Sequence, residues 1–348
     1  MSIIKHHKFG VTPKGVVSRY LLENQLGTSI GILNYGGIIQ SLVLKDQDGN
    51  DLDIVFGYDT IAEYQKDTIY TGGIIGQYAN RIRHGRFKLD GDTHQLTCNH
   101  NGHHLHGGQY GFLRQIWSVD PITEASSLRL RLTSEEDEEG YPGKVDVTVE
   151  YTLDNQNRLI IDYAATTDSP TPISLTNHSY FNLNGVGNGT IYNHQLKINA
   201  NEILEVDQDL IPTGQFISVT DTPFDLRQPV MLEKYLSSPH PSLQPTSGYD
   251  HQFVLDKEKA NISAEVFCVE SGLSMKMITT APGVQLYTAN GIGKIIGKHN
   301  KPYHNHHAFC LEAQSHPDSP NHPHFPNTIL RPGELYQMQT IYHFSVKS

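Results

Sequence analysis

One histidine, His178, lies at the end of an apolar segment and is flanked by amide and hydroxyl side chains in residues 171–185. A second chemically useful residue, Glu312, occurs near the C-terminus in the apolar segment 308–314. A carboxylate and a histidine can together remove a proton from one atom and deliver a proton to another, which is general acid/base catalysis. We therefore take His178 and Glu312 as the candidate catalytic pair.

Several short motifs elsewhere in the chain carry side chains that can hold a polar ligand. Arg81 has a planar fork of donors, and Asp250 can accept two hydroxyl hydrogen bonds. The amides of Asn80 and Gln285 both donate and accept, and His106 adds an imidazole. Together these side chains suit the many hydroxyl groups of a sugar, and an aromatic ring such as that of Tyr180 could cover the sugar's CH face.

The same residues also have structural interpretations. His178 and His106 could each bond a neighbouring backbone group, and Asp250 could cap a turn. Arg81 could pair with a surface carboxylate, and the two amides could serve turns and strand ends. Glu312 is harder to explain structurally, because burying a carboxylate without a partner is costly.

Alternation of apolar and polar residues predicts the elements that position these side chains. Residues 127–133 alternate cleanly, and residues 145–153 and 159–163 read as a hairpin across a turn at 154–157. Further strand pairs are expected on either side of residues 48–50, 90–91 and 270–272. Only 18% of residues are charged, while Gly and Pro are plentiful. The sequence therefore predicts an all-β fold of antiparallel sheets.

Helical pattern is weak, with at most a turn or two in residues 60–65 and 230–237. Segments 237–242 and 316–326 are rich in Ser, Pro and His and are expected to be loops over the sheets. The acidic run 135–139 is expected to be a solvated loop. No composition shift marks a domain boundary, so we expect one domain over residues 1–348.

Composition excludes several classes of protein. The net charge of −11 and the pI near 6.0 leave no basic stripe for nucleic acid. No stretch approaches the roughly 18 apolar residues of a membrane span, and the N-terminus lacks the apolar core of a signal peptide. We expect a cytoplasmic monomer or homodimer that contacts no membrane.

The three cysteines, Cys98, Cys268 and Cys310, are expected to be buried thiols without disulfides.

Twenty histidines invite a metal interpretation, because imidazole is a common metal ligand. Local clusters occur at 103–104, 304–307 and 316–324, yet no cysteine pairs with them and no His-Glu-x-x-His helix exists. We therefore expect neither a metal nor any other cofactor. The glycine pairs at 72–73 and 107–108 are too short for phosphate loops.

Eight motifs in order give the chain a wider resemblance. They are residues 76–82 (GQYANRI), 105–108 (LHGG), 139–143 (EGYPG), 176–183 (TNHSYFNL), 248–251 (GYDH), 282–288 (PGVQLYT), 310–314 (CLEAQ) and 325–327 (FPN). With these motifs the chain resembles the aldose 1-epimerase (galactose mutarotase) family along nearly its full length. The resemblance implies a large antiparallel β-sandwich of the galactose mutarotase type, with the sugar in an open cleft on one sheet.

In the family that the chain resembles, the matching glutamate is the general base and the matching histidine is the general acid. These roles fall on Glu312 and His178. The sugar-binding positions of the family fall on Asn80, Arg81, His106, Asp250 and Gln285, with Tyr180 as a wall of the cleft. The implied activity is interconversion of the α and β anomers of free aldohexoses such as galactose and glucose.

The chemistry of anomer exchange agrees with this pair. Opening the hemiacetal needs a proton taken from the C1 hydroxyl and a proton given to the ring oxygen, and reclosure reverses both transfers. A histidine with an ordinary pKa near ~6.5 could be tuned by acidic neighbours to carry a proton at working pH. We therefore expect a charged His178 beside an ionised Glu312.

Three other functions stay open at this point. A retaining glycosidase would use Glu312 and Asp250 as carboxylates about 5 Å apart. A hexose-6-phosphate mutarotase would need extra arginines, whereas few basic residues lie near the motifs. An inactive carbohydrate-binding protein would bind sugar without exchange. The loops at 135–139 and 303–307 depart from the family pattern and could alter sugar preference or pH response.

Overall fold

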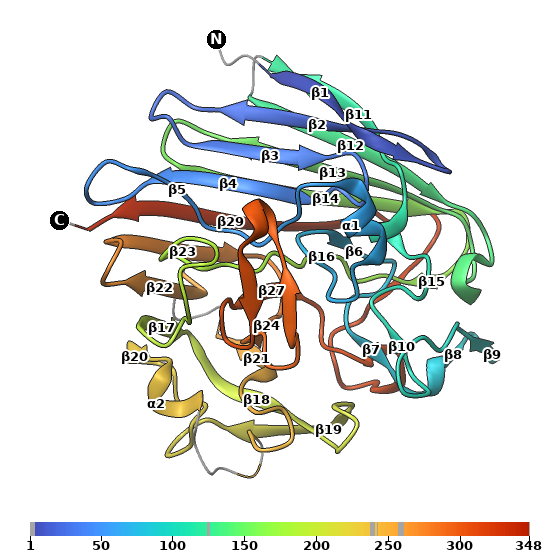
Figure 1. Cartoon of the computed structure of the whole chain (residues 1–348). Helices are drawn as coiled ribbons and strands as arrows, with labels where there is room; N and C mark the ends of the chain where they lie inside the picture. The colour runs from blue at the N-terminus through green and yellow to red at the C-terminus, as the bar shows by residue number, and fades with distance from the viewer. Residues whose placement is uncertain (1–3, 124–125, 237–240, 242, 257–260, 348) are drawn as a thin grey trace.

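Antiparallel sheets make up most of the regular structure of the chain (Figure 1). The computed structural model describes residues 4–123, 126–236, 241, 243–256 and 261–347. A five-stranded sheet near the N-terminus has the order β1-β2-β3-β4-β5. Its strands are β1 (Lys5–Thr12), β2 (Gly15–Glu23), β3 (Ser29–Leu33), β4 (Ile39–Lys45) and β5 (Asp51–Asp53).

A nine-stranded sheet is the largest layer, with the order β11-β12-β13-β14-β29-β23-β22-β17-β20. Its strands are β11 (Ser118–Ile122), β12 (Ser127–Ser134), β13 (Val145–Leu153), β14 (Arg158–Thr167), β29 (Tyr336–Val346), β23 (Leu273–Thr279), β22 (Ala264–Cys268), β17 (His194–Ile198) and β20 (Val230–Met231). Strand β29 lies in its middle, between β14 and β23.

A second five-stranded sheet has the order β19-β18-β21-β24-β27. Its strands are β19 (Pro212–Ser218), β18 (Ala200–Val206), β21 (Asp250–Leu255), β24 (Gly283–Tyr287) and β27 (Cys310–Gln314). Five short pairs complete the strands. They are β6 (Ile74–Ile75) with β16 (Thr176–Asn177), β7 (Arg81–Ile82) with β10 (His104–Leu105), β8 (Arg86–Leu89) with β9 (Asp92–Gln95), β15 (Thr171–Pro172) with β28 (Ile329–Leu330), and β25 (Lys294–Ile296) with β26 (Pro302–His304).

The helices are short. Those that lie wholly within the described residues are α1 (Ile61–Lys66), α2 (Glu233–Leu236) and 3-10 turns at Arg83–Gly85, Phe112–Arg114, Glu138–Gly140, Lys298–Asn300 and Ser319–Asn321. Thr60 caps α1, because its side chain accepts from the Glu63 backbone N–H while the Glu63 carboxylate accepts from the Thr60 N–H. None of the helices in the described part of the chain has the length and apolarity needed to cross a membrane.

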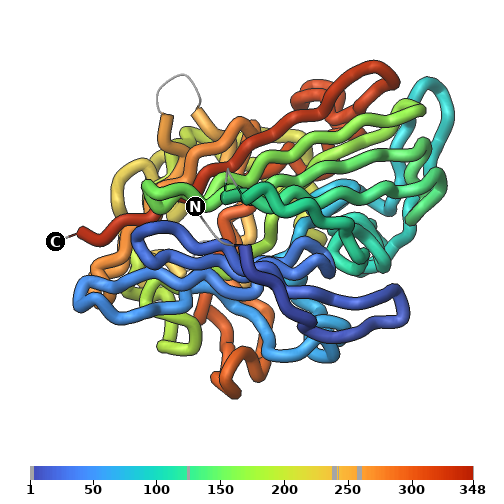
Figure 2. Tube along the Cα trace, turned by 90° about the horizontal axis from the view of Figure 1, so that it is seen from above, coloured from blue at the N-terminus to red at the C-terminus, as the bar shows by residue number. Residues whose placement is uncertain are grey.

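The nine-stranded sheet packs over the two five-stranded sheets, and the core lies between the layers. One hydrophobic cluster includes Ile32 of β3, Val149 of β13 and Leu286 of β24, so all three sheets contribute to it. Figure 2 shows the N-terminal strands and the large sheet as separate layers when the molecule is seen from above. The predicted β-sandwich is confirmed.

Strand alternation explains why these residues form these layers. In β13 every second residue from Val145 to Leu153 is buried, and the residues between them face outward. The predicted hairpin with β14 is confirmed, since Tyr151 pairs with Ile161 and the turn falls at 154–157. The strand pairs predicted around 48–50, 90–91 and 270–272 are confirmed as β4–β5, β8–β9 and β22–β23.

Three details of the sequence prediction differ. Residues 230–231 form a strand, because Val230 and Met231 pair with β17, so the expected helix begins only at Glu233. Of the loop expected at 237–242, residues 237–240 and 242 lie outside the described residues. Cys98 is exposed rather than buried, since it lies in the turn after β9, while Cys268 and Cys310 are buried; all three are free thiols.

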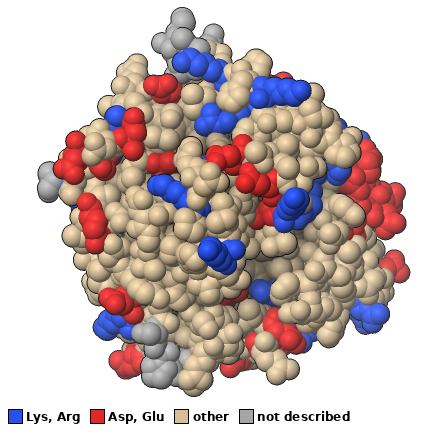
Figure 3. Space-filling model, viewed as in Figure 1, with Lys and Arg blue, Asp and Glu red and all other residues tan. Residues whose placement is uncertain are grey.

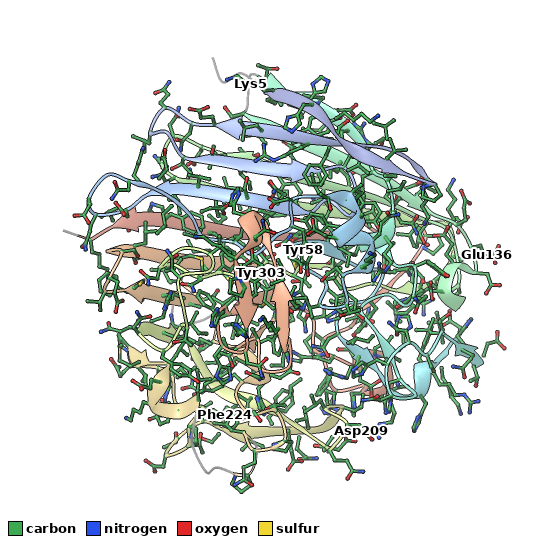
Figure 4. The ribbon with its side chains drawn as sticks, in the orientation of Figure 1. Lys5, Tyr58, Glu136, Asp209, Phe224 and Tyr303 are labelled. Carbon is green, nitrogen blue, oxygen red and sulfur yellow. The ribbon has the colours of Figure 1, made fainter. Side chains whose placement is uncertain are left out.

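The acidic run 135–139 is only partly the expected solvated loop. Residues 135–138 are exposed, and Glu136 lies at the rim of the molecule (Figure 4). Glu139 is half-buried instead, and its carboxylate accepts the backbone N–H groups of Gln109 and Tyr110 (3.1 and 2.6 Å). Glu139 can be half-buried because the two backbone N–H groups replace hydrogen bonds that its carboxylate loses with water.

Candidate active site

One cavity of about 410 Å³ gathers nearly all of the predicted site residues. It is lined by Thr68, Ile69, Tyr70, Asn80, Arg81, His100, Leu105, His106, His178, Tyr180, Leu210, Pro245, Thr246, Asp250, Tyr287, Asn290, Gly291 and Glu312. Seven of the eight predicted residues are in this set. The eighth, Gln285, does not line the cavity; its side-chain amide donates to Asp250 (2.7 Å) and so holds that carboxylate in place.

Strand β27 brings Glu312 to the cavity. All five of its residues are buried, but they face two different environments. Leu311 and Ala313 belong to the hydrophobic core, while Glu312 lies on the other face, beside Gln285 of β24. Glu312 is only 2% exposed, and its Oε2 has no hydrogen-bond partner in the described structure. This carboxylate is therefore buried on the polar side of an otherwise apolar strand.

Backbone bonds to the turn before β6 fix His178 opposite Glu312. The His178 N–H donates to Gly73 O and its carbonyl accepts from the Gly72 N–H (both 2.9 Å). Its Nε2 then lies 3.6 Å from Oε2 of Glu312, and its Nδ1 lies 3.6 Å from Sγ of Cys310. The ring of Tyr180 packs against the imidazole with a centroid distance of 5.0 Å. The acid/base pair expected from the sequence is thus brought face to face.

His106 presents a donor to the same space. The Asn80 N–H donates to Nδ1 of His106 (3.2 Å), and the His106 N–H donates back to Asn80 O (3.1 Å). Burial and the neighbouring His178 keep the pKa of His106 well below its ordinary value, so the ring is neutral. Because Nδ1 accepts a hydrogen bond, the proton of the neutral ring must be on Nε2.

Arg81 and Asp250 form a loose pair across the cavity. One guanidinium nitrogen of Arg81 lies 3.9 Å from Asp250 Oδ2, and another donates to Asn80 Oδ1 at 3.4 Å. The Arg81 Nε is buried and has no hydrogen-bond partner in the described residues. Arg81 therefore keeps donor capacity that an incoming hydroxyl group can use.

Burial shifts the pKa values of the candidate catalytic pair. Desolvation and the nearby Asp250 raise the pKa of Glu312 well above its usual range, against the opposing effect of Arg81. Desolvation lowers the pKa of His178 to about 4. Burial therefore disfavours the charged form of both groups, and the imidazole is neutral at neutral pH. This differs from the expected charged histidine, because burial outweighs the acidic neighbours.

The histidine clusters named from the sequence do not gather into a metal site within the described residues. The group that does come together is His106, His178 and Glu312, whose ligand-type atoms lie within 4.8 Å of one another. In this arrangement, however, Nε2 of His106 carries the proton. A metal bound there would require the Asn80 N–H to face a protonated Nδ1. The group is therefore organised for hydrogen bonding rather than for metal coordination.

Sequence reasoning missed the aromatic walls of the cavity other than Tyr180. Tyr70 has a positive φ of 60° and packs its ring 4.6 Å from that of His106, and Tyr287 packs against Tyr180. Asp67 holds the turn that carries Tyr70, accepting from the Thr71 N–H (2.8 Å). The only signal was an aspartate followed by a tyrosine three residues later, which is too common to indicate a site.

The second histidine of the 103–104 cluster supports the site from behind. Nε2 of His104 bonds the hydroxyl of Tyr141 (2.6 Å), and its Nδ1 bonds Thr97 O (2.7 Å). With the bonds from Glu139 to residues 109–110, these contacts fix the loop that carries His106. The motif at 139–143 therefore contributes to the site through the loop it holds and not by lining the cavity.

Comparison with known proteins agrees with this geometry. The family model described as aldose 1-epimerase matches residues 18–343. The galactose mutarotase of Bos taurus is 42% identical over 97% of each chain, and the aldose 1-epimerase of Escherichia coli K12 is 35% identical over 96% of this chain and 97% of its own.

Solved structures give the same result over the whole chain. The GalM/aldose epimerase homologue of C. elegans superposes with a TM-score of 0.87 at 31% identity, covering all of both chains. The galactose 1-epimerase of Lactobacillus acidophilus NCFM superposes with a TM-score of 0.89 at 26% identity and the same coverage. With this family model over most of its length and these relatives, the chain belongs to the aldose 1-epimerase family.

Proposed function

We propose that this chain interconverts the α and β anomers of free aldohexoses, galactose and glucose among them. The observation that carries the proposal is the 3.6 Å approach of His178 Nε2 to Glu312 Oε2 inside the cavity of a family member. The two groups are close enough to serve the two oxygens bonded to one anomeric carbon. Anomer exchange needs this arrangement, because both proton transfers occur at C1 and the ring oxygen.

In the forward direction, Glu312 accepts the proton of the C1 hydroxyl and His178 gives a proton to the ring oxygen. The bond between C1 and the ring oxygen breaks, and the sugar becomes an open-chain aldehyde. Rotation about the C1–C2 bond then presents the other face of the aldehyde. Reclosure returns the proton from Glu312 to the C1 oxygen and a proton from the ring hydroxyl to His178, so both groups end as they began.

The direction of the pKa shifts is compatible with these roles. We propose that the pair shares one transferable proton, and burial favours its place on Glu312 by raising the pKa of this carboxyl group. When a sugar hydroxyl donates to Glu312 and Arg81 approaches, the carboxylate is stabilised and the proton moves to His178. The bound sugar thereby creates the base and the acid that its own ring opening requires.

The remaining side chains bind and orient the sugar. We propose that Arg81, Asn80 and His106 donate to sugar hydroxyls, that Asp250 accepts from two of them, and that Gln285 acts by holding Asp250. The ring of Tyr180 borders the same space, and its hydroxyl is used in a bond to Ile69 O (2.8 Å). No cofactor is part of this proposal.

Free sugars fit the charge of the cavity better than sugar phosphates. Among the described residues that line it, Arg81 is the only lysine or arginine. A phosphate group at C6 would be poorly matched there, since phosphate sites collect several cationic or backbone donors. The charged side chains on the face in Figure 3 are scattered and form no basic stripe. This scatter agrees with a neutral substrate and with the absence of nucleic acid among the proposed partners.

We further propose that residues 1–348 act as one domain, as a monomer or homodimer in the cytoplasm. A single hydrophobic cluster that runs from Leu22 to Phe344 supports the one-domain proposal. The site supports it as well, since Asn80 and Glu312 come from distant parts of the chain.

Polarimetry on freshly dissolved α-D-galactose and α-D-glucose tests the function. The protein should bring both sugars to their equilibrium rotation faster than buffer alone, at a rate proportional to enzyme concentration. α-D-Glucose 6-phosphate should equilibrate more slowly, and a chromogenic β-galactoside should release no aglycone. A galactose rate equal to that of buffer would refute the proposal, and release of the aglycone would favour a glycosidase.

A further inference from the structure

The loop that follows the catalytic strand returns to the segment that carries Arg81. After β27 the chain passes through residues 315–322, including the 3-10 turn Ser319–Asn321, and runs beside β7 and β8. Asp318 has a left-handed backbone conformation with φ of 57° at the start of this turn. The loop is one of the histidine-rich segments to which the sequence gave no role.

Asp318 bonds the backbone of β7 on both sides of Ile82. Its own N–H donates to Arg81 O (2.8 Å), and its Oδ1 accepts from the Arg83 N–H (2.9 Å). The same Oδ1 accepts from Nδ2 of Asn321 (2.7 Å). One residue thus fixes the position of the two peptide groups that flank Ile82, and the first of these contains the carbonyl of Arg81.

A second contact holds the other end of the same segment. The hydroxyl of Tyr78 donates to His316 O (3.0 Å) and accepts from the Ser319 N–H (3.2 Å). Tyr78 is fully buried and lies two residues before Asn80. Residues 78–83 are therefore tied at both ends to the loop that leaves the catalytic strand.

The side chain of Arg81 has few contacts of its own that could set its position. Its nearest partners lie at 3.4 and 3.9 Å, and its Nε has none in the described structure. Its placement therefore depends on where the backbone of β7 lies. A guanidinium that is held from its backbone can remain free to bond an incoming sugar.

Asp318 is also costly to bury, which argues against an incidental turn residue. It is 1% exposed, and its Oδ2 has no hydrogen-bond partner among the residues that the structure describes. Nε2 of His322 lies 3.4 Å from this oxygen. An unpaired oxygen on a buried carboxylate costs free energy that only a useful contact elsewhere would offset. The bond that Oδ1 accepts from the Arg83 N–H is such a contact, and it acts on the same strand as the backbone bond from the Asp318 N–H to Arg81 O.

We propose that Asp318 is a positioning residue that holds Arg81 at the catalytic pair, with Tyr78 as its second support. The inference rests on the proposed function, because Arg81 is placed in that site. It assigns the segment 316–322 a role in sugar turnover: the loop fixes the distance between Glu312 on one side and Arg81 on the other.

The test is a double-mutant cycle between Asp318 and Arg81. Asp318→Ala removes the acceptor and should lower kcat/KM for α-D-galactose about 10- to 100-fold, since small displacements of a positioning group have effects of this size. Asp318→Asn keeps an oxygen for the Arg83 N–H and should stay within about twofold of wild type. In an Arg81→Ala background, Asp318→Ala should change kcat/KM by less than about twofold.

A merely structural role predicts a different result, because a general loss of fold lowers activity equally with or without Arg81. An Asp318→Ala effect that persists in full in the Arg81→Ala background therefore overturns the proposal. Asp168→Ala is the control: its carboxylate also accepts a backbone N–H, from Lys144 (2.8 Å), but it does not line the cavity. It should leave kcat/KM unchanged.

Tyr78→Phe keeps the test decisive if Asp318→Ala does not fold. This change removes one hydroxyl and keeps the ring, so kcat/KM should fall in the wild-type background and not in Arg81→Ala. An unchanged rate in Tyr78→Phe would count against the proposal. If the wild-type protein shows no mutarotase activity, the proposed function fails, and the same cycle read as galactose dissociation constants by calorimetry still tests the positioning role.

Discussion

The nine-stranded sheet and the sugar cavity are held together by different forces. In β13 and β14 every second side chain enters a continuous apolar core. Around the cavity, the strand that carries Arg81 and the strand that precedes His106 are each only two residues long, and Asn80, His106 and Tyr70 all have positive φ angles. The sheet is specified by apolar burial, whereas the cavity is specified by hydrogen bonds between distant loops.

The comparison explains why strand β27, which carries Glu312, can contribute to both regions. Its period of two directs Leu311 to the core and Glu312 to the cavity, so one strand joins the stable layer to the reactive group. The rigid sheet keeps Glu312 in place, and the loops complete the site around it. Mutations in the two regions should therefore separate stability from activity.

Glu312→Gln should have the largest effect, on activity alone. The amide keeps the shape of the side chain but cannot accept the C1 proton as a carboxylate does, so kcat should fall ~10²–10⁴-fold. Unfolding in urea should show equal or greater stability, because a buried ionisable group without a full set of partners has been removed. Full mutarotase activity in this variant would show that Glu312 is not the base.

His178→Asn extends the same prediction to the acid. The rate should fall to a similar extent, and the double variant with Glu312→Gln should lose much less than the product of the two single losses, since the groups act as one relay. Mutarotase rates of the wild type, the two single variants and the double variant, measured by polarimetry, complete this double-mutant cycle. Independent, multiplicative losses would contradict the paired mechanism.

Ile161→Ala, in the nine-stranded sheet, should lower stability and leave activity unchanged. Ile161 is fully buried opposite Tyr151, so its truncation should lower the free energy of unfolding by ~2–5 kcal/mol and leave kcat per folded molecule unchanged. Thr166→Ala, on the exposed face of the same strand, should change stability by less than ~0.5 kcal/mol. A large loss of kcat in folded Ile161→Ala would mean that the two regions are not separable.

The sheet could be predicted from the sequence more completely than the cavity. The hairpin of β13 and β14 was predictable because alternation is local and repeats over many residues. The family motifs placed seven residues in one cavity, yet Gln285 was assigned to the sugar and lies behind Asp250. Gln285 shares a face of β24 with Tyr287, which lines the cavity, and a motif does not state that the Asp250 carboxylate accepts from the Gln285 amide.

Other features of the site depend on contacts between distant segments. Tyr70 reaches the cavity only because its backbone adopts a positive φ in the turn after Asp67. Asp318 in a histidine-rich loop showed no pattern that pointed to β7. The neutral state of His178 was also missed, because composition reports the number of acidic residues and not the depth of burial.

Arg81→Lys should have a smaller effect than loss of the base. Lysine keeps the charge but lacks the planar fork, and one bond from a charged donor contributes ~1.5–3 kcal/mol, so kcat/KM should fall about 10- to 100-fold while the fold persists. Steady-state polarimetry and circular dichroism measure the two properties. Unchanged kinetics would remove Arg81 from the site and would leave the loop at Asp318 without its proposed function.

Acid should weaken the sheet through buried histidines outside the catalytic pair. Desolvation lowers the pKa of His194 to about 4, and its Nε2 accepts the Leu183 N–H (2.9 Å). Since the unfolded histidine binds its proton near pH 6.5, the stability contributed by neutral His194 is complete above that pH and is lost as pH falls toward 4. The loss between pH 7 and pH 4.5 should be about 2 kcal/mol.

His194→Gln tests this directly. The amide oxygen can still accept from the Leu183 N–H, but it does not titrate. The variant should be less stable than wild type at pH 7.5 because packing changes, yet its free energy of unfolding should fall less between pH 7 and pH 4.5. Equal losses in the two proteins would assign the acid sensitivity to other groups, among them His104 and His316, whose pKa values are also lowered to about 4 by burial.

Chelation should have the smallest effect, and it separates two explanations for the order of the cavity. If hydrogen bonds hold His106, His178 and Glu312 together, exhaustive dialysis against a strong chelator should leave the mutarotase rate within about twofold, since the reaction needs only proton transfers. If a metal organises them, the rate should collapse and recover with a single cation. We expect the first outcome because the Asn80 N–H donates to Nδ1 of His106. This bond places the ring proton on Nε2, where a metal would have to bind.

Metal analysis of the dialysed protein should accompany the assay. Recovery of a lost rate by one added cation would mean that this hydrogen bond rearranges in the active protein, and the cavity would then be held by coordination as well as by its loops.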